Sequence, residues 1–188
     1  MSARAAEFDA LYRADPDPWR METSRYEAAK YDATLRALPR AEYRVGLEVG
    51  CSIGVLTARL AERCEALAAL DVSANALARA RQRPGCEGVR FMRAEVPGDW
   101  PAAPRDLIVL SEVLYFLEPD EIAAVAALAV RDLAPDGTII TVNWLGECDR
   151  TIDGAGAAAL FSREARSLGL RRAGSVVEPS YRIDVLER

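Results

Sequence analysis

One short segment, residues 50–54, has the residue types and spacing best suited to bind a cofactor. Residues 45–49 before it form an apolar run that predicts a buried parallel strand. The apolar spacing that starts at Val55 predicts a helix after it. Gly50 and Gly54 let a ligand approach the backbone closely, and the helix N-terminus offers free N–H groups. Strand, glycine turn and helix together predict a nucleotide-type cofactor site.

The acid at position 48 and the spacing of the loop indicate which cofactor this site prefers. Glu48 lies two residues before the first glycine, where a carboxylate repels a pyrophosphate and suits a cationic or hydroxyl-rich ligand. The dinucleotide pattern needs a third glycine, but Gly50-Cys51-Ser52-Ile53-Gly54 is followed by valine and leucine. The loop therefore favours S-adenosylmethionine (SAM), which carries an amine, a sulfonium and a ribose but no phosphate, over NAD.

Asp71 closes the second predicted strand, 21 residues after Gly50. In this layout a carboxylate at that place accepts both ribose hydroxyls of a cofactor, and Val72 lies beside it in the same binding set. The alternative role for Asp71 is to cap a helix over residues 73–80. The loop upstream favours the ribose role.

Two further strand ends carry polar residues that should lie at the same edge of the sheet, where open α/β sheets bind ligands. Glu95 follows the third strand and is the candidate acceptor for an adenine amino group, with the Val96 backbone at the ring edge; an exposed turn is the alternative for Glu95. Ser111 ends the fourth strand, and Glu112 and Tyr115 follow it beside the transferable methyl. Glu112 could instead be a surface acid, and Tyr115 could pack in the core.

The residues before the first strand predict two helices over the site. A helix over residues 3–14 ends at the prolines of residues 15–18, and a second helix is expected over residues 20–38. We expect residues 1–40 to form a helical lid, with plain packing of its aromatic side chains on the sheet as the alternative. The residues assigned there are Trp19 and Glu22 near the acceptor, and Arg25 and Tyr26 near the cofactor.

Strands and helices alternate after this segment, which predicts a doubly wound α/β sheet in one domain over residues 1–188, with its core at 41–188. The last two strands, 170–178 and 181–187, are too close in sequence to form anything but an antiparallel hairpin. We therefore expect a mostly parallel seven-stranded sheet with an antiparallel last strand and helices on both faces. The other strands are expected at 43–49, 66–72, 88–94, 105–111 and 136–143, and the other helices at 53–64, 74–82, 119–133 and 153–168.

Composition narrows the class of protein. With 188 residues, 51% of them hydrophobic, the chain is typical of one globular domain, and its net charge of −5 disfavours nucleic acid as a partner. The sequence contains no run of 18 apolar residues, so no membrane span is predicted. Residues 1–10 lack the apolar core of a signal peptide, so a cytoplasmic location is expected. Because there is no histidine and the four cysteines have no paired spacing, no metal is expected, and Cys51 is interpreted as a small loop residue.

Several segments together resemble one known family. They are Asp15-Pro-Asp-Pro-Trp19, Thr23-Ser-Arg-Tyr-Glu27 with Lys30-Tyr31, residues 47–57, Asp99-Trp-Pro101, and residues 107–113 with Tyr115. The glycine loop is shared by many class I SAM-dependent methyltransferases. The Asp-Pro-Trp and Ser-x-Tyr-Glu pair is similar, more narrowly, to the nodulation protein S (NodS) family. The resemblance implies a Rossmann-like class I methyltransferase fold.

The resemblance also implies N-methylation, since NodS methylates the free amine of a deacetylated chitooligosaccharide. The family usually has His-Trp after the fifth strand, where this chain has Asn143-Trp144, and a second family histidine falls near Ala158. These departures leave the small-molecule acceptor open, with Asn143 and Trp144 assigned to its side of the site. The alternatives are an O-methyltransferase on a hydroxyl or carboxyl acceptor, and a SAM-binding accessory or regulatory protein without turnover. The protein is expected to be a monomer or homodimer.

Methyl transfer from a sulfonium is an in-line displacement, so the protein mainly aligns the acceptor lone pair, the methyl group and the sulfur. An amine acceptor must be neutral, whereas a hydroxyl acceptor needs more help from a base. Glu112 and Tyr115 are the catalytic candidates, and Glu22 and the N-terminal tyrosines are further candidate bases.

Overall fold

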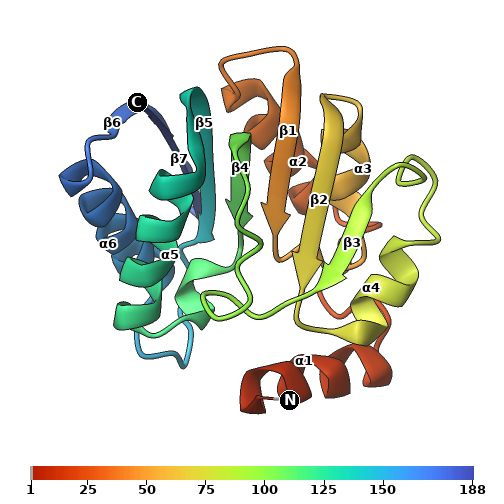
Figure 1. Cartoon of the computed structure of the whole chain (residues 1–188). Helices are drawn as coiled ribbons and strands as arrows, with labels where there is room; N and C mark the ends of the chain where they lie inside the picture. Colours follow the sequence, from red (N-terminus) through yellow and green to blue (C-terminus); the bar gives the residue numbers. More distant parts are fainter. Residues whose placement is uncertain (1) are drawn as a thin grey trace.

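The computed structural model describes residues 2–188, whose strands form a seven-stranded sheet (Figure 1). The strands are β1 Tyr43–Val49, β2 Cys64–Asp71, β3 Arg90–Arg93, β4 Arg105–Ser111, β5 Leu133–Trp144, β6 Arg171–Val177 and β7 Tyr181–Glu187. Their order across the sheet is β3-β2-β1-β4-β5-β7-β6. β7 runs antiparallel to both β5 and β6, and the pairs from β3 to β5 are parallel. The predicted mostly parallel sheet with an antiparallel last strand is confirmed.

Helices cover both faces of the sheet (Figure 1). They are α1 Ala3–Ala14, α2 Arg25–Ala37, α3 Val55–Ala61, α4 Ala74–Ala80, α5 Pro119–Asp132 and α6 Gly154–Ser167, with a 3-10 turn, η1, at Leu114–Phe116. Alternate residues of β4 point to opposite faces, which is why this strand is a continuous apolar run. Ile108 packs with Phe161 on the side of α5 and α6. Val109 packs with Tyr31 and Leu60 on the side of α2 and α3.

The start of α2 differs from the prediction of residue 20. The Asp17 carboxylate accepts hydrogen bonds from the backbone N–H groups of Met21 and Glu22, at 2.8 and 3.0 Å, which hold this stretch in a turn. Ser24 then caps the helix by accepting from the N–H of Glu27 at 3.3 Å. The predicted start is therefore wrong, because side-chain-to-backbone hydrogen bonds compete with the helix in this stretch.

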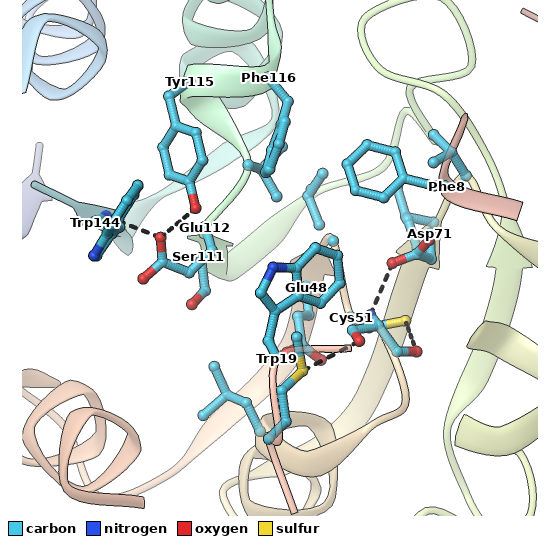
Figure 2. Close-up of a pocket in the computed structure, with 18 of the residues that line it drawn as sticks. Phe8, Trp19, Glu48, Cys51, Asp71, Ser111, Glu112, Tyr115, Phe116 and Trp144 are labelled. Carbon is cyan, nitrogen blue, oxygen red and sulfur yellow. Dashed lines mark hydrogen bonds between the residues drawn. The ribbon is translucent and has the colours of Figure 1, made fainter. Parts of the chain in front are cut away.

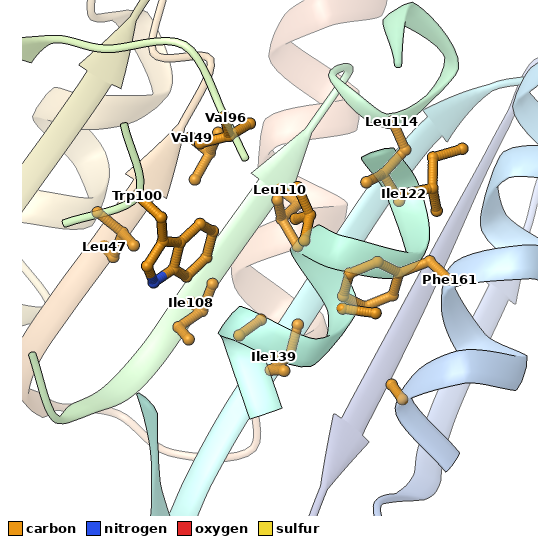
Figure 3. Packing of buried hydrophobic residues seen from close by; sticks show 14 of the residues in the cluster. Leu47, Val49, Val96, Trp100, Ile108, Leu110, Leu114, Ile122, Ile139 and Phe161 are labelled. Carbon is orange, nitrogen blue, oxygen red and sulfur yellow. The ribbon is translucent and has the colours of Figure 1, made fainter. Parts of the chain in front are cut away.

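The segment after β3 folds back over the sheet and closes its core (Figure 3). Trp100 packs against Leu47 and Ile108, and its indole N–H donates to Asp132 at 2.9 Å. Val96 belongs to the same buried cluster, which continues to β1 through Val49. Packing of this kind fixes the strand ends that a ligand at their carboxyl edge would meet.

The two N-terminal helices occupy different places. α1 lies across the carboxyl ends of the strands (Figure 1), where Asp9 accepts from the Ser73 hydroxyl at 2.7 Å and pairs with Arg93 at 3.1 Å. α2 instead packs on the sheet, with Tyr31 and Leu38 inside a core cluster. The part of the N-terminal region that lies over the strand ends is thus α1 with the turn that follows it. Within residues 2–188, no helix is both long enough and apolar enough to cross a membrane.

Candidate functional site

A cavity of about 720 Å³ opens at the carboxyl ends of β1, β2 and β4, with α1 forming part of its wall. This volume is in the range of sites for small molecules. Figure 2 shows two polar groups of residues in the wall, one at Asp71 and one at Glu112 with Tyr115 and Trp144, and Trp19 between them. We call them the Asp71 end, made by Glu48, residues 50–52, Asp71 and Val72, and the Glu112 end, made by Glu27, Lys30, Glu112, Tyr115 and Trp144.

The glycine loop is held in left-handed backbone conformations. Gly50 has φ +79°, and a Cβ there would lie 2.2 Å from the Val113 side chain. Ser52, although not a glycine, has φ +51°, and its hydroxyl contacts the Tyr12 hydroxyl of α1. Gly54 has φ +80° and packs against the end of α4 rather than lining the cavity. Gly50 therefore clears space at the cavity, and Gly54 joins α3 to α4.

Asp71 is fixed by backbone amides. Its two carboxylate oxygens each accept one N–H, from Ser52 and from Ser73, both at 2.8 Å. The helix cap that was its alternative role belongs to Ser73, whose hydroxyl accepts from Ala76 N–H at 3.2 Å. Burial raises the pKa of Asp71 to about 6, although the two amides favour the ionised form. Each oxygen keeps a lone pair that can accept a ligand hydroxyl.

Glu48 is buried in the wall beside the loop, with 1% of its surface exposed. Its Oε2 atom has no hydrogen-bond partner within residues 2–188. Burial, with the nearby Asp71 carboxylate, raises the pKa of Glu48 to about 7. An unpartnered buried oxygen is costly, so it is suited to receive a donor from a ligand.

At the next strand end, Glu95, Val96 and Ser111 all line the cavity. Glu95 is paired with Arg4 of α1 at 3.2 Å, and its own backbone N–H donates to Asp99 at 3.0 Å. Glu95 thus ties α1 to the loop after β3. Glu95 is therefore not an isolated residue of an exposed turn, which was the alternative for it.

Glu112 is the centre of the other end (Figure 2), and its carboxylate accepts three hydrogen bonds. Its Oε2 accepts from the Tyr115 hydroxyl at 2.7 Å and from the Trp144 backbone N–H at 2.9 Å. Its Oε1 accepts from Lys30 at 2.6 Å. Its backbone has φ +57°, and its N–H donates to the Val142 carbonyl at 2.8 Å, which turns the side chain toward β5. Three donors already engage this carboxylate, so it is not free to act as a base.

Tyr115 is likewise not poised as a base. Burial and the Glu112 carboxylate raise the pKa of Tyr115 far above its usual value. The hydroxyl therefore stays protonated and donates to Glu112. The two candidate catalytic residues do meet, as one hydrogen-bonded pair facing the cavity.

Aromatic side chains of α1 and the turn after it cover the cavity. Phe8 packs edge-on against Phe116 with ring centres 5.0 Å apart. Trp19 lies 5.6 Å from Tyr12 and 6.2 Å from Phe8, measured between ring centres. Such faces suit a sulfonium or an ammonium group. Across the opening, Glu7 of α1 pairs with Arg150 at 2.7 Å.

The structure brings most predicted site residues to one cavity. Four do not line it: Gly54, Glu22, Arg25 and Asn143. Glu22 pairs instead with Arg79 and Arg83, at 3.4 and 2.5 Å. The fourteen that do line it are Trp19, Tyr26, Glu48, Gly50, Cys51, Ser52, Asp71, Val72, Glu95, Val96, Ser111, Glu112, Tyr115 and Trp144.

Sequence reasoning missed the contribution of the N-terminal helices. Phe8 and Tyr12 are four residues apart on α1, so they share a helix face, and this spacing was the signal that could have found them. Glu27 and Lys30 form a similar pair on α2, joined by a 3.0 Å ion pair. Further cavity residues that were not predicted include Arg4, Glu7, Phe116, Cys148, Asp149 and Arg150.

Comparison with known proteins gives consistent matches. The family model for nodulation protein S (NodS) matches residues 6–177. Nodulation protein S of Bradyrhizobium diazoefficiens is 37% identical over 164 residues, which cover 81% of this chain and 75% of that protein. Among solved structures, a putative methyltransferase from Pseudomonas syringae is 35% identical, with TM-score 0.74, over 87% of this chain and 99% of that one.

A second solved structure is more similar to this protein in fold than in sequence. It is the N-methyltransferase NodS from Bradyrhizobium japonicum WM9 in complex with S-adenosyl-L-homocysteine (SAH). It superposes with TM-score 0.79 at 24% identity, over 94% of this chain and 95% of that one. The Rossmann-like sheet and the family match agree along nearly the whole sequence, so this chain belongs to the NodS family of methyltransferases.

Proposed function

We propose that this protein transfers a methyl group from SAM to a small amine and releases SAH. The observation that carries the proposal is the charge of the single cavity that contains both ends. Seven carboxylates and three cationic side chains line it, which leaves a clear excess of negative charge. SAM carries a sulfonium, and a methylated amine carries the positive charge that the sulfonium loses. An acidic cavity stabilises the cation on both sides of the reaction.

The Asp71 end suits the cofactor. Asp71 would accept the ribose hydroxyls with the lone pairs that Ser52 and Ser73 leave free. Glu48 would accept a donor at its unpartnered oxygen. Glu95 and Val96, which line the same cavity, would meet the adenine. When bound, SAM supplies an activated methyl group, and these residues bind and orient it.

The Glu112 end favours an amine over a hydroxyl acceptor. A hydroxyl needs a base at neutral pH, but the Glu112 carboxylate is already engaged by three donors and Tyr115 holds its proton. An amine with a free lone pair needs alignment rather than a base. The proposal includes a cytoplasmic location, in keeping with four free cysteines, and a monomer or homodimer.

An acceptor screen tests the proposal. The protein is incubated with SAM and a panel of small amines, alcohols and carboxylic acids, and both SAH release and methyl gain are followed by mass spectrometry. We expect SAH release with at least one amine and none without acceptor. Methyl gain confined to alcohols or acids would overturn the amine assignment. SAH binding without turnover on any acceptor would favour an accessory role.

A further inference from the structure

Lys30 is the one lysine of the chain, and every other basic residue is an arginine. Its side chain is 3% exposed and lies in the wall of the cavity. The ammonium group donates to Glu112 Oε1 at 2.6 Å and to Glu27 Oε1 at 3.0 Å, and it lies 5.0 Å from the Tyr26 ring centre. A lysine offers a compact point charge where a planar guanidinium needs more room. The place of this ammonium is therefore specific to the site.

The proposed reaction moves positive charge from the sulfur toward the end of the cavity that holds Lys30. The methyl carbon leaves sulfur and bonds to the acceptor nitrogen, while the electron pair of the broken C–S bond stays on sulfur. The sulfonium becomes neutral and the nitrogen becomes an ammonium, which later gives up a proton to water. Negative charge that faces the nitrogen therefore stabilises the transition state more than it stabilises the neutral amine.

We infer that Lys30 is a positioning residue for methyl transfer, which holds Glu27 and Glu112 as an ionised pair with one net negative charge facing the acceptor nitrogen. The inference rests on the proposed amine methylation. Lys30 does not touch the reacting atoms; it acts through the two carboxylates. Without it, the two carboxylates would share a partly buried site with no cation between them, which disfavours both being charged. The excess negative charge would then depend on pH.

The groups around Lys30 keep this charge constant. Burial alone lowers the pKa of Lys30, but the Glu112 and Glu27 carboxylates outweigh it and raise it overall. Burial also raises the pKa values of the neighbouring Tyr31, Tyr115 and Tyr181, so these phenols stay neutral. Tyr26 faces the Lys30 ammonium, Glu48 acts on Tyr31, and Cys148 and Arg150 lie near Tyr115.

Two substitutions at this position test the inference by kinetics. We expect Lys30→Met to bind SAH within about twofold of the wild type and to lose kcat on an amine by about 100-fold. Its pH–rate profile should gain a limb that the wild type lacks, because the two carboxylates no longer share a cation. Lys30→Arg keeps the charge and should recover part of kcat and the original profile. Arg36→Met, which removes an exposed cation from the same helix, is the matched control and should change neither.

A spectroscopic measurement separates this inference from the proposed function. Because the chain has a single lysine, ¹⁵N-lysine labelling gives one side-chain amine signal in NMR. We expect that signal to titrate above the ordinary range of a lysine amine and to shift in Glu112→Gln. Titration of the signal below its ordinary range, or wild-type kcat and pH profile in Lys30→Met, would overturn the positioning role. If the wild type methylated only hydroxyls, the proposed function would fail. The NMR result would still decide whether Lys30 is ion-paired with Glu27 and Glu112.

Discussion

The Asp71 end and the Glu112 end of the cavity hold their carboxylates by different means. Asp71 is fixed by two backbone N–H groups from residues within the adjoining loops. Glu112 is fixed mainly by the side chains of Lys30 and Tyr115, with one backbone N–H from Trp144. Backbone donors persist through side-chain substitution, whereas side-chain donors change with a single residue. The proposed cofactor side is thus robust to substitution, whereas single substitutions can change the proposed acceptor side.

This contrast determines which part of the cavity a single substitution can alter. At the Glu112 end, a substitution at Lys30 or Tyr115 alters charge and shape without disturbing the glycine loop. At the Asp71 end, the geometry follows from the left-handed conformations of Gly50 and Ser52.

Removing the carboxylate at the Asp71 end should have the largest effect. Asp71→Ala should weaken SAH binding by roughly 2–4 kcal/mol, because two charge-assisted hydrogen bonds to ribose hydroxyls are lost with partial rescue by water. Calorimetric titration measures it. Asp136→Ala, at a 63% exposed side chain paired with Arg40, is the matched control. Unchanged affinity in a folded Asp71 variant would show that this residue only holds its loop.

Filling the space at Gly50 should come next. Gly50→Ala places a methyl group 2.2 Å from the Val113 side chain at a φ of +79°, so overpacking and backbone strain act together. We expect a stability loss of roughly 1–3 kcal/mol and at least tenfold weaker SAH binding. Thermal melting and titration measure the two effects. Gly88→Ala, where a Cβ meets nothing within 4 Å, is the control, and adding Val113→Ala should recover part of the loss. No recovery in the double variant would mean that strain, not overpacking, dominates.

Lower pH should weaken binding at the Asp71 end. The pKa of Asp71 is raised to about 6, so this carboxyl is ionised at pH 8 and mostly protonated at pH 5. Because one unit below the pKa leaves about a tenth of the group ionised, SAH affinity should fall roughly tenfold between pH 8 and pH 5. Glu48, with its pKa raised to about 7, adds to the same trend. If Asp71→Ala showed the full wild-type pH dependence in titrations, Asp71 would not be the titrating group.

Opening the cavity should have the smallest effect. We propose that α1 and the turn after it act as a lid, which the partly exposed Glu7–Arg150 pair helps to hold closed. Arg150→Ala should loosen the lid by roughly 0.2–1 kcal/mol and less at high salt. Hydrogen exchange of residues 3–14 with and without SAH measures it, with Arg163→Ala, a surface pair on α6, as the control. Equal protection of α1 in all states would argue for static packing.

The two ends also differ in how far the sequence could predict them. Local pattern places Glu48, Gly50, Ser52 and Asp71 together, because they belong to the first strand, the loop that follows it and the end of the second strand. Lys30 and Glu112 are 82 residues apart and meet only because α2 packs beside β4 and β5. Their pairing depends on tertiary geometry that no local spacing contains. The same holds for Arg4 and Glu95, which are 91 residues apart.

Helix boundaries that depend on competing side-chain hydrogen bonds also could not be predicted from the sequence. The turn at residues 21–23 depends on which backbone N–H groups Asp17 can reach in the folded chain. By contrast, the strands at residues 43–49, 105–111 and 181–187 were predicted to the residue, because burial on two faces or a tight hairpin leaves little freedom in their limits.

The positions of the three tryptophans give this protein an optical property. Trp19 and Trp144 line the cavity, while Trp100 is buried in the core with its indole N–H bound to Asp132. Two of the three indoles therefore sense what enters the cavity, and the third reports only on folding. Intrinsic fluorescence should thus carry two separable signals: a change in emission on ligand entry that Trp19→Phe and Trp144→Phe reduce, and an unfolding signal that survives in the double variant through Trp100.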